Sequence, residues 1–424
     1  MKSKWSLSTI DQVCILVTDG AHNSPKSVEE GEYMVSVKDF TEYGFDFTNC
    51  RKISRKDYEI LEKQGCIPEI DDILVGKDGA RYFEDIIIYR QEERPTLLSS
   101  IAILRVDKSK VTPEFLYYML KSPFFKQDVR DNYGSGSAIP RIVLRDFKRM
   151  PISFPDLKEQ RRITSLCETI DKKIQLNKRI NDNLEQQAQA LFKSWFVDFE
   201  PFEEPFVDSP MGYSVPKSIP VVQIADIPHV LETGKRPKGG AVSEGVPSIG
   251  AENVKKLGTV DFSSAKFIPE EFAAAMKKGE VKGYELMIYK DGGKPGTFIP
   301  HFSMFGEGFP YKHFFINEHV FKLDFGNRGY NEFCYFYFQT DYAYNWLANN
   351  GGKAAVPGIN QQDVNSIWIF HPEHPQVESF CEWVQPIFTA ILKNCTQNVK
   401  LANLRDTLLP KLMAGEIDVT TIDV

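Results

Sequence analysis

The stretch GSGSAIPRIVLRDFKRMPISFP, residues 134–155, decides the fold, because the chain carries a second version of it. GGKAAVPGINQQDVNSIWIFHP, residues 351–372, aligns with it without a gap at an offset of 217, and seven of the twenty-two positions are identical. A repeat with a period of about half the chain is far too long for a solenoid. The sequence therefore predicts a tandem duplication of one domain.

Shorter matches upstream occur in the same order. Lys77-Asp78-Gly79 corresponds to Lys290-Asp291-Gly292 at an offset of 213, and Asp19-Gly20 corresponds to Thr233-Gly234 at 214. Loops of slightly different length account for the change in offset. Any one of these matches could arise by chance, but several in one order indicate a real repeat.

Each copy is followed by a heptad pattern. Residues 158–195 contain no Pro or Gly, and their seven-residue recurrence has two columns, Ile163, Ile170, Asn177, Leu184, Leu191 and Cys167, Ile174, Asn181, Ala188, Trp195. The offset of 217 gives Phe380, Ile387, Asn394, Leu401, Leu408 and Val384, Ile391, Asn398, Arg405, Leu412 in the second copy. This pattern predicts a long helix after each domain, with a seam for another helix.

Asparagines occupy equivalent places in the two seams, Asn177 with Asn394 and Asn181 with Asn398. A buried Asn in a helical seam lowers stability but fixes register. We therefore expect the two helices to pair with each other, and an approximate two-fold between the copies predicts that they run antiparallel. The alternative is that each helix packs on its own domain. Pro386 predicts a kink or a restart in the second helix.

The predicted fold class is α+β, with two tandem domains of mixed β-sheet and helices, each followed by a long helix of an antiparallel coiled coil. Short β-branched runs at 86–91, 97–106, 285–290 and 319–325 predict strands, and 113–122 and 331–349 have helical spacing. The expected boundaries are 1–155 for the first domain, 156–199 for its helix, 200–217 for an extended, Pro-rich linker, 218–372 for the second domain, 373–415 for its helix and 416–424 for a tail.

Composition limits the function classes. The chain of 424 residues has a net charge of −7, and the two domains are nearly neutral, with 23 basic and 24 acidic residues in 1–155 and 15 and 16 in 218–372. Any nucleic-acid affinity of this chain alone is therefore expected to be weak. Seven scattered cysteines predict reduced thiols, and the absence of a signal peptide or a long apolar run predicts a cytoplasmic protein.

Sequence motifs of catalysis are absent. The chain contains no GxxxxGK[ST], no GxGxxG after a strand, no His-Glu-x-x-His and no Asn-Pro-Pro-aromatic element. His371 and His374 are spaced like metal ligands but are expected to be surface residues, so no metal site is predicted. Glu270 with Glu280-x-Lys282 resembles a nuclease carboxylate pattern, but the intervening segment is helix-like where a strand is needed.

Polar, Gly-rich and locally basic loops lie in matching places of the two copies, where Gly allows close approach to a ligand and Lys, Arg, Asn and Ser can grip phosphate or read base edges. The candidate DNA-binding residues of the first copy are His22, Asn23, Lys26, Lys77, Arg81, Ser135, Ser137 and Arg141. Those of the second copy are Thr233, Lys235, Arg236, Lys238, Lys290, Lys294, Lys312 and Lys353.

This organisation, with FKSWFVDFEPF at 192–202 and LRDTLLPKLMAGEI at 404–417 at the helix ends, resembles the DNA specificity subunits of type I restriction-modification systems. The TG-x-x-P turn at 233–237 is typical of them, whereas the first copy has Thr18-Asp19-Gly20-Ala21-His22 there. The resemblance implies a non-catalytic subunit that recognises a bipartite sequence in double-stranded DNA. It also implies two modification subunits that use S-adenosylmethionine and restriction subunits that use ATP, with Mg and these cofactors on the partners and none on this chain.

Partner binding is predicted at the helix ends, because their apolar surface exceeds what a two-helix seam can bury. The residues are Phe192, Trp195, Phe196, Phe199, Leu408, Leu409, Leu412 and Met413. Two alternatives stay open from the residues alone. One is a duplicated protein-binding scaffold without DNA binding, and the other is a Mg-dependent nuclease that uses Glu270 and Glu280.

Overall fold

The computed structural model describes residues 5–79, 81–134, 140–352 and 356–419, with the side chain of Ser263 excepted. The chain forms two compact units. The first unit is Met1–Lys172 with Leu401–Val424, and the second unit is Lys173–Lys400. The division falls within the two long helices, α6 (Leu157–Phe196) and α11 (Pro375–Met413), so each unit contains a part of both.

The first unit is built on a four-stranded antiparallel sheet in the order β2-β8-β5-β6 and a three-stranded sheet in the order β4-β3-β7. Strand β3 pairs antiparallel with β4 and parallel with β7, and β1 pairs antiparallel with β9. The strands are β1 Ser6–Thr9, β2 Cys14–Asp19, β3 Glu32–Val35, β4 Arg51–Ile53, β5 Ile73–Gly76, β6 Ile86–Ile88, β7 Thr96–Leu97, β8 Ile101–Val106 and β9 Pro151–Phe154.

The second unit repeats this plan strand for strand. Its sheets have the orders β13-β19-β16-β17, β15-β14-β18 and β12-β20, and β14 pairs parallel with β18 as β3 does with β7. The strands are β12 Val221–Gln223, β13 Val230–Thr233, β14 Val246–Ile249, β15 Lys266–Ile268, β16 Leu286–Tyr289, β17 Phe302–Met304, β18 Phe315–Ile316, β19 Val320–Asp324 and β20 Trp368–Phe370. The predicted duplication, α+β class and four strand segments are therefore confirmed.

Short helices cover the sheets, and their starts follow from local capping. Thr112 caps the helix that begins at Pro113, since its side chain accepts a hydrogen bond from the Phe115 N–H at 3.2 Å. Thr340 caps a new helix in the same way, which splits the predicted helical stretch 331–349 in two. The short helices are α1 Ile10–Val13, α2 Arg55–Lys63, α3 Pro113–Lys121, α4 Pro123–Asn132, α5 Leu144–Arg149, α7 Glu270–Ala275, α8 Arg328–Tyr337, α9 Asp341–Gly351 and α10 Gln361–Asn365.

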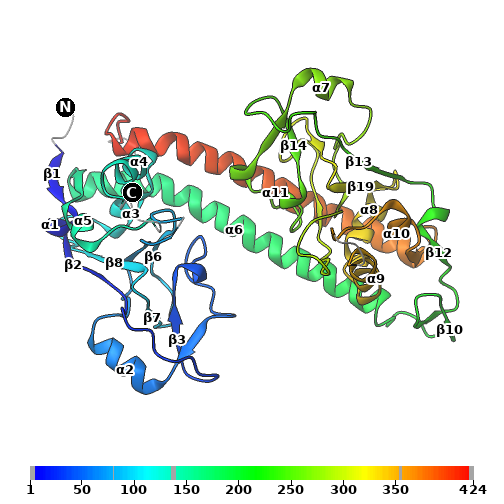
Figure 1. Ribbon diagram of the computed structural model, residues 1–424, viewed down its shortest axis with the longest axis horizontal. Coiled ribbons are helices and arrows are strands. Elements are labelled where there is room, and N and C mark those ends of the chain that lie inside the picture. The colour runs from blue at the N-terminus through cyan, green and yellow to red at the C-terminus, as the bar shows by residue number, and fades with distance from the viewer. Residues whose placement is uncertain (1–4, 80, 135–139, 353–355, 420–424) are drawn as a thin grey trace. The chain divides into compact units, whose positions relative to one another are not determined.

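In the second unit, α6 and α11 lie side by side and run antiparallel (Figure 1). Asn394 donates from Nδ2 to Asn181 Oδ1 at 2.8 Å, and Asn177 donates from Nδ2 to Asn398 Oδ1 at 2.8 Å. The seam asparagines therefore pair across the two helices, which fixes the register as the sequence predicts.

In the first unit, the remaining turns of the same helices also run antiparallel. Arg405 donates from Nη1 to Asp171 Oδ1 at 2.5 Å, and the other Asp171 oxygen accepts from the Tyr118 hydroxyl at 2.7 Å. Asp171 is 5% exposed, so this charge is buried but fully paired. Each unit by itself therefore contains an antiparallel helix pair.

The prediction that Pro386 restarts the second helix is wrong. Helix α11 continues through it, although the proline removes one backbone donor. Val384 and Phe388 on either side are fully buried in the core of the second unit. Their packing offsets the missing hydrogen bond.

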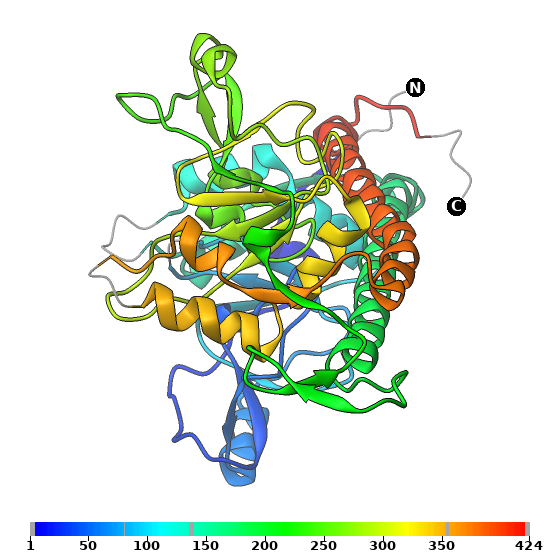
Figure 2. The same cartoon turned by 90° about the vertical axis from the view of Figure 1, so that its right-hand side faces the viewer.

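The expectation of an extended linker at 200–217 is also wrong. Strands β10 (Phe206–Asp208) and β11 (Ser214–Pro216) pair antiparallel as a hairpin, the green ribbon in Figure 2. Met211 and Val215 are buried in the core of the second unit. The hairpin is therefore part of that unit, because its apolar side chains, which alternate with prolines in the sequence, pack on the core of the unit.

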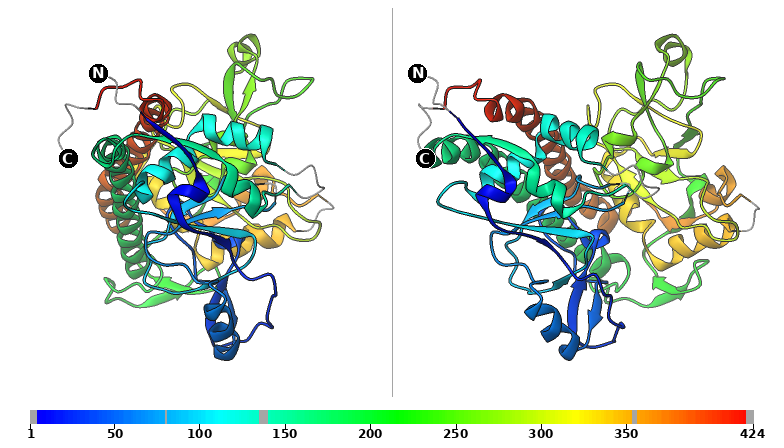
Figure 3. Two further views of the ribbon diagram at one scale, coloured as in Figure 1. Left: turned by 90° about the vertical axis from the view of Figure 1, so that its left-hand side faces the viewer. Right: turned by 60° about the vertical axis from the view of Figure 1, so that its left-hand side comes forward.

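The two chain ends take part in the first unit. Trp5 packs on Phe115 with ring centroids 6.0 Å apart, and a Cβ on Gly415 would meet the Trp5 ring at 3.3 Å. Ile417 and Val419 join the same hydrophobic core. The N-terminal strand β1 and the C-terminal end of α11 thus belong to one unit (Figure 3).

Candidate nucleic-acid interface

The Lys-Asp-Gly motif and the proline loop of the first unit are joined by backbone hydrogen bonds. The Gly79 N–H donates to the Pro140 carbonyl at 2.9 Å, and the Ile142 N–H donates to the Lys77 carbonyl at 2.9 Å. Lys77 follows strand β5, and its own N–H donates to the Ser100 carbonyl just before β8. Three segments that are far apart in the sequence therefore meet at one edge of the four-stranded sheet.

The second unit makes the same junction. The Gly292 N–H donates to the Pro357 carbonyl at 2.9 Å, and the Ile359 N–H donates to the Lys290 carbonyl at 2.8 Å. The Lys290 N–H donates to the His319 carbonyl at 3.0 Å, just before β19. The motifs matched in the sequence are thus brought together in the same way in both units.

A glycine fixes the neighbouring turn in each unit. A Cβ on Gly20 would lie 2.1 Å from the Leu97 carbonyl oxygen, and one on Gly234 would lie 1.5 Å from the Ile316 carbonyl oxygen. Both distances are too short for any side chain. Only Gly therefore lets the turn after β2 pass so close to strand β7, and the turn after β13 so close to strand β18. The pairing of Asp19-Gly20 with Thr233-Gly234 is thereby explained.

Of the two motif lysines that the sequence predicts to bind DNA, Lys77 is buried and Lys290 is half-buried. Lys77 is 7% exposed, and its Nζ lies 3.4 Å from Asp19 Oδ2 and 3.6 Å from Asp78 Oδ1. Lys290 is partly buried, with its Nζ 2.6 Å from Asp291 Oδ2. Charges inside the fold need partners, and these lysines are already paired. They anchor the junction.

Asp291 is the centre of the charge cluster in the second unit. Burial alone would raise the pKa of its carboxyl, but hydrogen bonds from Lys290 and His319 outweigh burial and lower that pKa. His319 Nε2 also lies 3.3 Å from Glu318 Oε1, and Arg236 Nε lies 3.1 Å from the same oxygen. A series of side-chain contacts therefore leads from the motif lysine through Asp291, His319 and Glu318 to Arg236.

The first unit has a shorter chain of the same kind. Asp19, 8% exposed, faces Lys77 and lies 3.1 Å from His22 Nε2 through Oδ1. The His22 side chain itself is 75% exposed. A carboxylate held by the motif lysine thus holds a surface side chain in this unit as well.

Most other predicted DNA-binding residues lie on the surface. The exposed ones are Asn23, Lys26, Arg81, Arg141, Lys235, Lys238, Lys294 and Lys312, while Thr233 is half-buried. Arg81 is engaged by Asp85 at 2.8 Å. Ser135, Ser137 and Lys353 lie outside the described residues. The surface of both units thus offers side chains that can donate hydrogen bonds to phosphate or base edges.

Most residues of the predicted partner-binding set are buried. Phe192, Phe196 and Phe199 are buried in the second unit, where their rings pack on Phe333 and Phe370 at centroid distances of 5.2–6.0 Å. In the first unit Leu409, Leu412 and Met413 are buried in its core. Only Trp195 and Leu408 of the predicted set are partly exposed. Each domain covers the helix end with its own residues, which the heptad analysis did not consider.

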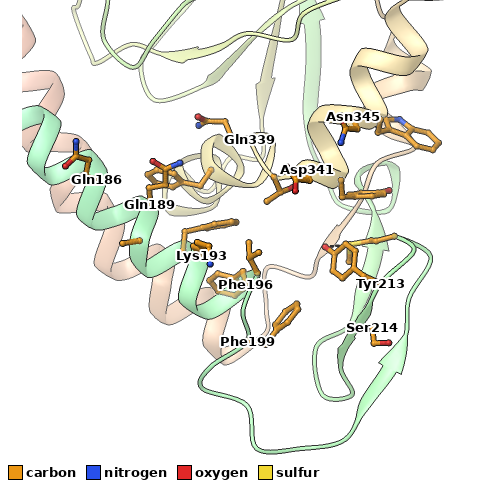
Figure 4. Close-up of a pocket in the computed structure, with 18 of the residues that line it drawn as sticks. Gln186, Gln189, Lys193, Phe196, Phe199, Tyr213, Ser214, Gln339, Asp341 and Asn345 are labelled. Carbon is orange, nitrogen blue, oxygen red and sulfur yellow. Dashed lines mark hydrogen bonds between the residues drawn. The ribbon is translucent and has the colours of Figure 1, made fainter. Parts of the chain in front are cut away.

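A groove of about 1060 Å³ lies beside the end of α6 in the second unit. Figure 4 shows aromatic rings on its floor, including Phe196 and Tyr213, and amide side chains on its rim, including Gln186, Gln189 and Gln339. The hairpin and α9 form its other walls. The surface beside the helix end therefore combines aromatic rings with amide groups and with the charged side chains of Lys193 and Asp341.

The described residues do not form the metal site that the nuclease alternative requires. Within the described ranges, no group of three or more His, Cys, Asp or Glu side chains could hold a metal ion. Glu270 begins helix α7, and Glu280 lies 3.1 Å from His313. His371 and His374 accept hydrogen bonds from the Glu373 and Gln376 N–H groups at 3.2 Å, so they cap the turn before α11. Both histidines are half-buried, where the sequence analysis expected surface residues, and their ring nitrogens serve as local caps.

Sequence reasoning missed Asp19, Glu318 and His319. Their signal was their position, at the end of β2 or directly before β19, opposite the Lys-Asp-Gly turn. None of them forms a motif alone, because the cluster depends on sheet order. None of the helices in the described part of the chain has the length and apolar character that a bilayer span requires.

Two copies of one mixed-sheet domain, each with polar loops on a fixed turn and each packed on a long helix, define a tandem recognition protein. Residues 2–186 match the family described as Type I restriction modification DNA specificity domain. This match and the relatives described next show that the chain is similar to type I restriction-modification specificity subunits.

Two relatives carry this similarity, and a solved structure shares the fold. The chain is 29% identical over 327 residues to the Type I restriction enzyme MjaIX specificity subunit of Methanocaldococcus jannaschii, covering 74% of this chain and 71% of that protein. It is 25% identical over 378 residues to the Type I restriction enzyme HindI specificity subunit of Haemophilus influenzae, covering 74% and 80%. The crystal structure of a Type-I restriction-modification system S subunit from M. genitalium shares the fold, with a TM-score of 0.52, 16% identity and coverage of 97% and 96%.

Proposed function

We propose that this chain is the non-catalytic subunit that gives a type I restriction-modification complex its DNA sequence specificity. Each unit recognises one half of a bipartite target in double-stranded DNA. The observation that carries this proposal is the equivalent junction of the Lys-Asp-Gly turn, the glycine turn and the proline loop in both units. A duplicated surface built from duplicated motifs suits a target with two halves.

Partner subunits supply most of the affinity and all of the chemistry in this proposal. Both domains are nearly neutral, so few phosphates can be neutralised by this chain alone. Two modification subunits bring S-adenosylmethionine for adenine methylation, and restriction subunits bring ATP and Mg for translocation and cleavage. The complex acts on DNA in the cytoplasm.

The long helices are the proposed attachment sites for those partners and the spacer between the half-sites. Trp195 and Leu408 are the partly exposed members of the predicted helix-end set. Val197, 46% exposed, and Lys193 add surface next to Trp195 along the same helix end. Variants at Trp195 and Val197 are therefore better probes of partner binding than variants at the buried Phe196.

The test is to express the chain with its modification subunits and map methylated adenines across the genome of the host. We expect one bipartite sequence whose methylation disappears without this chain. Replacing residues 218–372 by the equivalent domain of a relative should change one half of that sequence and leave the other half intact. Changes in both halves, or in neither, would contradict independent reading by the units.

A gel-shift assay and a cleavage assay separate this proposal from the two alternatives. A protein-binding scaffold would leave duplex DNA unshifted in a gel even when the modification subunits are present. A nuclease would cut DNA with Mg²⁺ in the absence of partners, and the variants Glu270→Gln and Glu280→Gln would abolish that cleavage. We expect no cleavage by this chain alone and a shift only with partners.

A further inference from the structure

A side chain able to carry positive charge stands two residues after the turn glycine in both units. His22 follows Gly20, and Arg236 follows Gly234. Both side chains reach solvent, with exposed fractions of 75% for His22 and 43% for Arg236. The equivalent residue of each domain therefore projects from the same kind of turn.

The turns that carry these residues are rigid. The Gly20 N–H donates to the Ile101 carbonyl at 3.2 Å and the Ala21 N–H to the Leu97 carbonyl at 2.7 Å. In the second unit the Gly234 N–H donates to the Asn317 carbonyl at 3.2 Å. Together with the close approach of each glycine to a carbonyl oxygen, these bonds fix where the following side chains begin.

A carboxylate orients each of the two side chains. Asp19 Oδ1 lies 3.1 Å from His22 Nε2, and Glu318 Oε1 lies 3.1 Å from Arg236 Nε. The two carboxylates come from different elements, the end of β2 and the loop before β19. The same arrangement is thus reached by different residues, which argues against an accidental surface pair.

The Lys-Asp-Gly motif in turn holds these carboxylates. In the first unit Lys77 pairs directly with Asp19. In the second unit Lys290 pairs with Asp291, Asp291 with His319, and His319 with Glu318. The buried lysine therefore acts on the surface side chain through its neighbours, which gives the motif a positioning role.

The nitrogen atoms that these ion pairs leave available differ between the two side chains, and so does the base edge that each can recognise. The pairing of Arg236 Nε with Glu318 leaves both Nη groups, which together match the O6 and N7 acceptors of guanine in the major groove. The pairing of His22 Nε2 with Asp19 leaves only Nδ1 for a single hydrogen bond. Arg236 is thus suited to a strong choice of one base and His22 to a weaker one.

We propose that Arg236 and His22 are the equivalent base-reading residues of the two domains, that Arg236 selects a guanine, and that Glu318 and Asp19 are the positioning residues that aim them. The proposal rests on DNA recognition as the function of the chain. It adds to that function one base position in each half-site and a role for the motif lysines.

The experiment uses the complete complex with its modification subunits and a panel of duplexes that carries each of the four bases at every position of both half-sites. Methylation rates give the base preference at each position. For Arg236→Ala we expect a preference for guanine at one position of the second half-site to fall by roughly 5- to 150-fold. The first half-site should be read as before.

Glu318→Gln should weaken the preference at that same position while the arginine is present, and should add little to Arg236→Ala. This lack of additivity is a readout that a general loss of stability would not give. Lys277→Ala is the control, because Lys277 is an exposed cation of the same unit that lies outside the predicted DNA-binding set. It should leave every base preference unchanged.

His22→Ala should change the preference at one position of the first half-site only, and by less than Arg236→Ala. If Arg236→Ala weakens binding to all sequences equally and only reduces the salt dependence, Arg236 holds phosphate and the proposal is overturned. The proposal also fails if Arg236→Ala and Glu318→Gln affect different positions. If the unmodified complex shows no bipartite target at all, the proposed function fails first.

Discussion

The two units build the same three sheets, but they close the fold with different pieces of chain. In the second unit a continuous segment, the hairpin β10–β11, follows α6 and leads into β12. In the first unit the corresponding place is taken by the two chain ends, where Trp5 meets Gly415 and Ile417 and Val419 enter the core. The sheet and helix packing therefore determines the domain, and the connection that completes it is free to vary.

The charge clusters show a second difference of the same kind. In both units the lysine after β5 or β16 lies near the aspartate of its own motif, Asp78 or Asp291, and in the first unit it also pairs with Asp19. The backbone junction is the same in both. The motif thus provides the same backbone framework in both domains, and the residues around it differ. This is expected if each domain recognises a different half-site.

The largest expected effect tests whether the helix end belongs to the domain. Phe196→Asp places an unpaired carboxylate among buried aromatic rings, which should cost more than about 4–5 kcal/mol and unfold the second unit. Limited proteolysis and thermal melts of the complete chain would show this. Val197→Asp, at the exposed neighbour, is the control and should leave the melting profile unchanged while it weakens binding of a modification subunit.

The same comparison extends to the first unit. Met413 is equivalent to Phe196 at the offset of 217 and is 3% exposed. Met413→Ala should lower the stability of the first unit by about 2–5 kcal/mol and leave the second transition in place. A single transition that shifts as a whole with either variant would show that the two units do not melt separately.

A pH effect should be confined to the second unit. Burial raises the pKa of Glu332 to about 8 despite its ion pair with Arg328. Counted from the helix caps Asn327 and Thr112, the corresponding residue of the first unit is Tyr117. An acid whose folded-state pKa lies above its ordinary value of 4.5 contributes stability at low pH that is lost as the pH rises from 4.5 to about 8.

The measurement is the melting temperature of each unit between pH 5 and pH 9. We expect the second unit to lose up to about 4–5 kcal/mol over the rise, at 1.4 kcal/mol per pKa unit, and the first unit to change less. Glu332→Gln should flatten the profile of the second unit. An equally steep decline in that variant would assign the effect to other groups.

Much of the fold was predictable because it depends on local patterns. Short runs of aliphatic, β-branched and aromatic residues marked the strands at 285–290 and 319–325, the heptad columns marked both long helices, and the seam asparagines specified their pairing. Pro386 was misread because its cost is local, whereas the packing of Val384 and Phe388 that offsets it comes from the rest of the unit. The hairpin at 206–216 was missed for the same reason.

The site was predictable only as a set of loops. Sequence alignment placed Lys77 and Lys290 correctly at equivalent positions, but not their burial, because a lysine in a Gly-rich loop usually reaches solvent. Asp19, Glu318 and His319 gain their roles from the order of strands, which brings β2, β5 and β8 or their equivalents to one edge. Such neighbours have no fixed spacing in the chain.

Substitutions of the two turn glycines should cause a smaller loss of stability. Gly234→Ala and Gly20→Ala both force a Cβ against a backbone carbonyl, at 1.5 Å and 2.1 Å, and should cost about 1–3 kcal/mol each, with the larger loss at Gly234. Each variant should also disturb recognition of its own half-site, measured by the methylation rate on single-base variants of the target. Gly76→Ala is a control for stability, since its Cβ would meet nothing closer than 3.5 Å.

The smallest expected effect concerns the helix seam, where the units use different pairs. The second unit pairs Asn181 with Asn394, and the first pairs Asp171 with Arg405. Replacing both asparagines by leucine removes two polar groups from a partly buried seam, so the second unit should melt higher, by about 1 kcal/mol of added stability, while its register becomes less specific. Replacing Arg405 alone should instead lower the stability of the first unit, since Asp171 would keep only the Tyr118 hydroxyl. Thermal melts of the two variants would measure stability. Disulfide trapping between cysteines introduced at matched and shifted seam positions would measure register.

Equal changes in stability and register in the two seams would show that the asparagine pair and the ion pair have the same role.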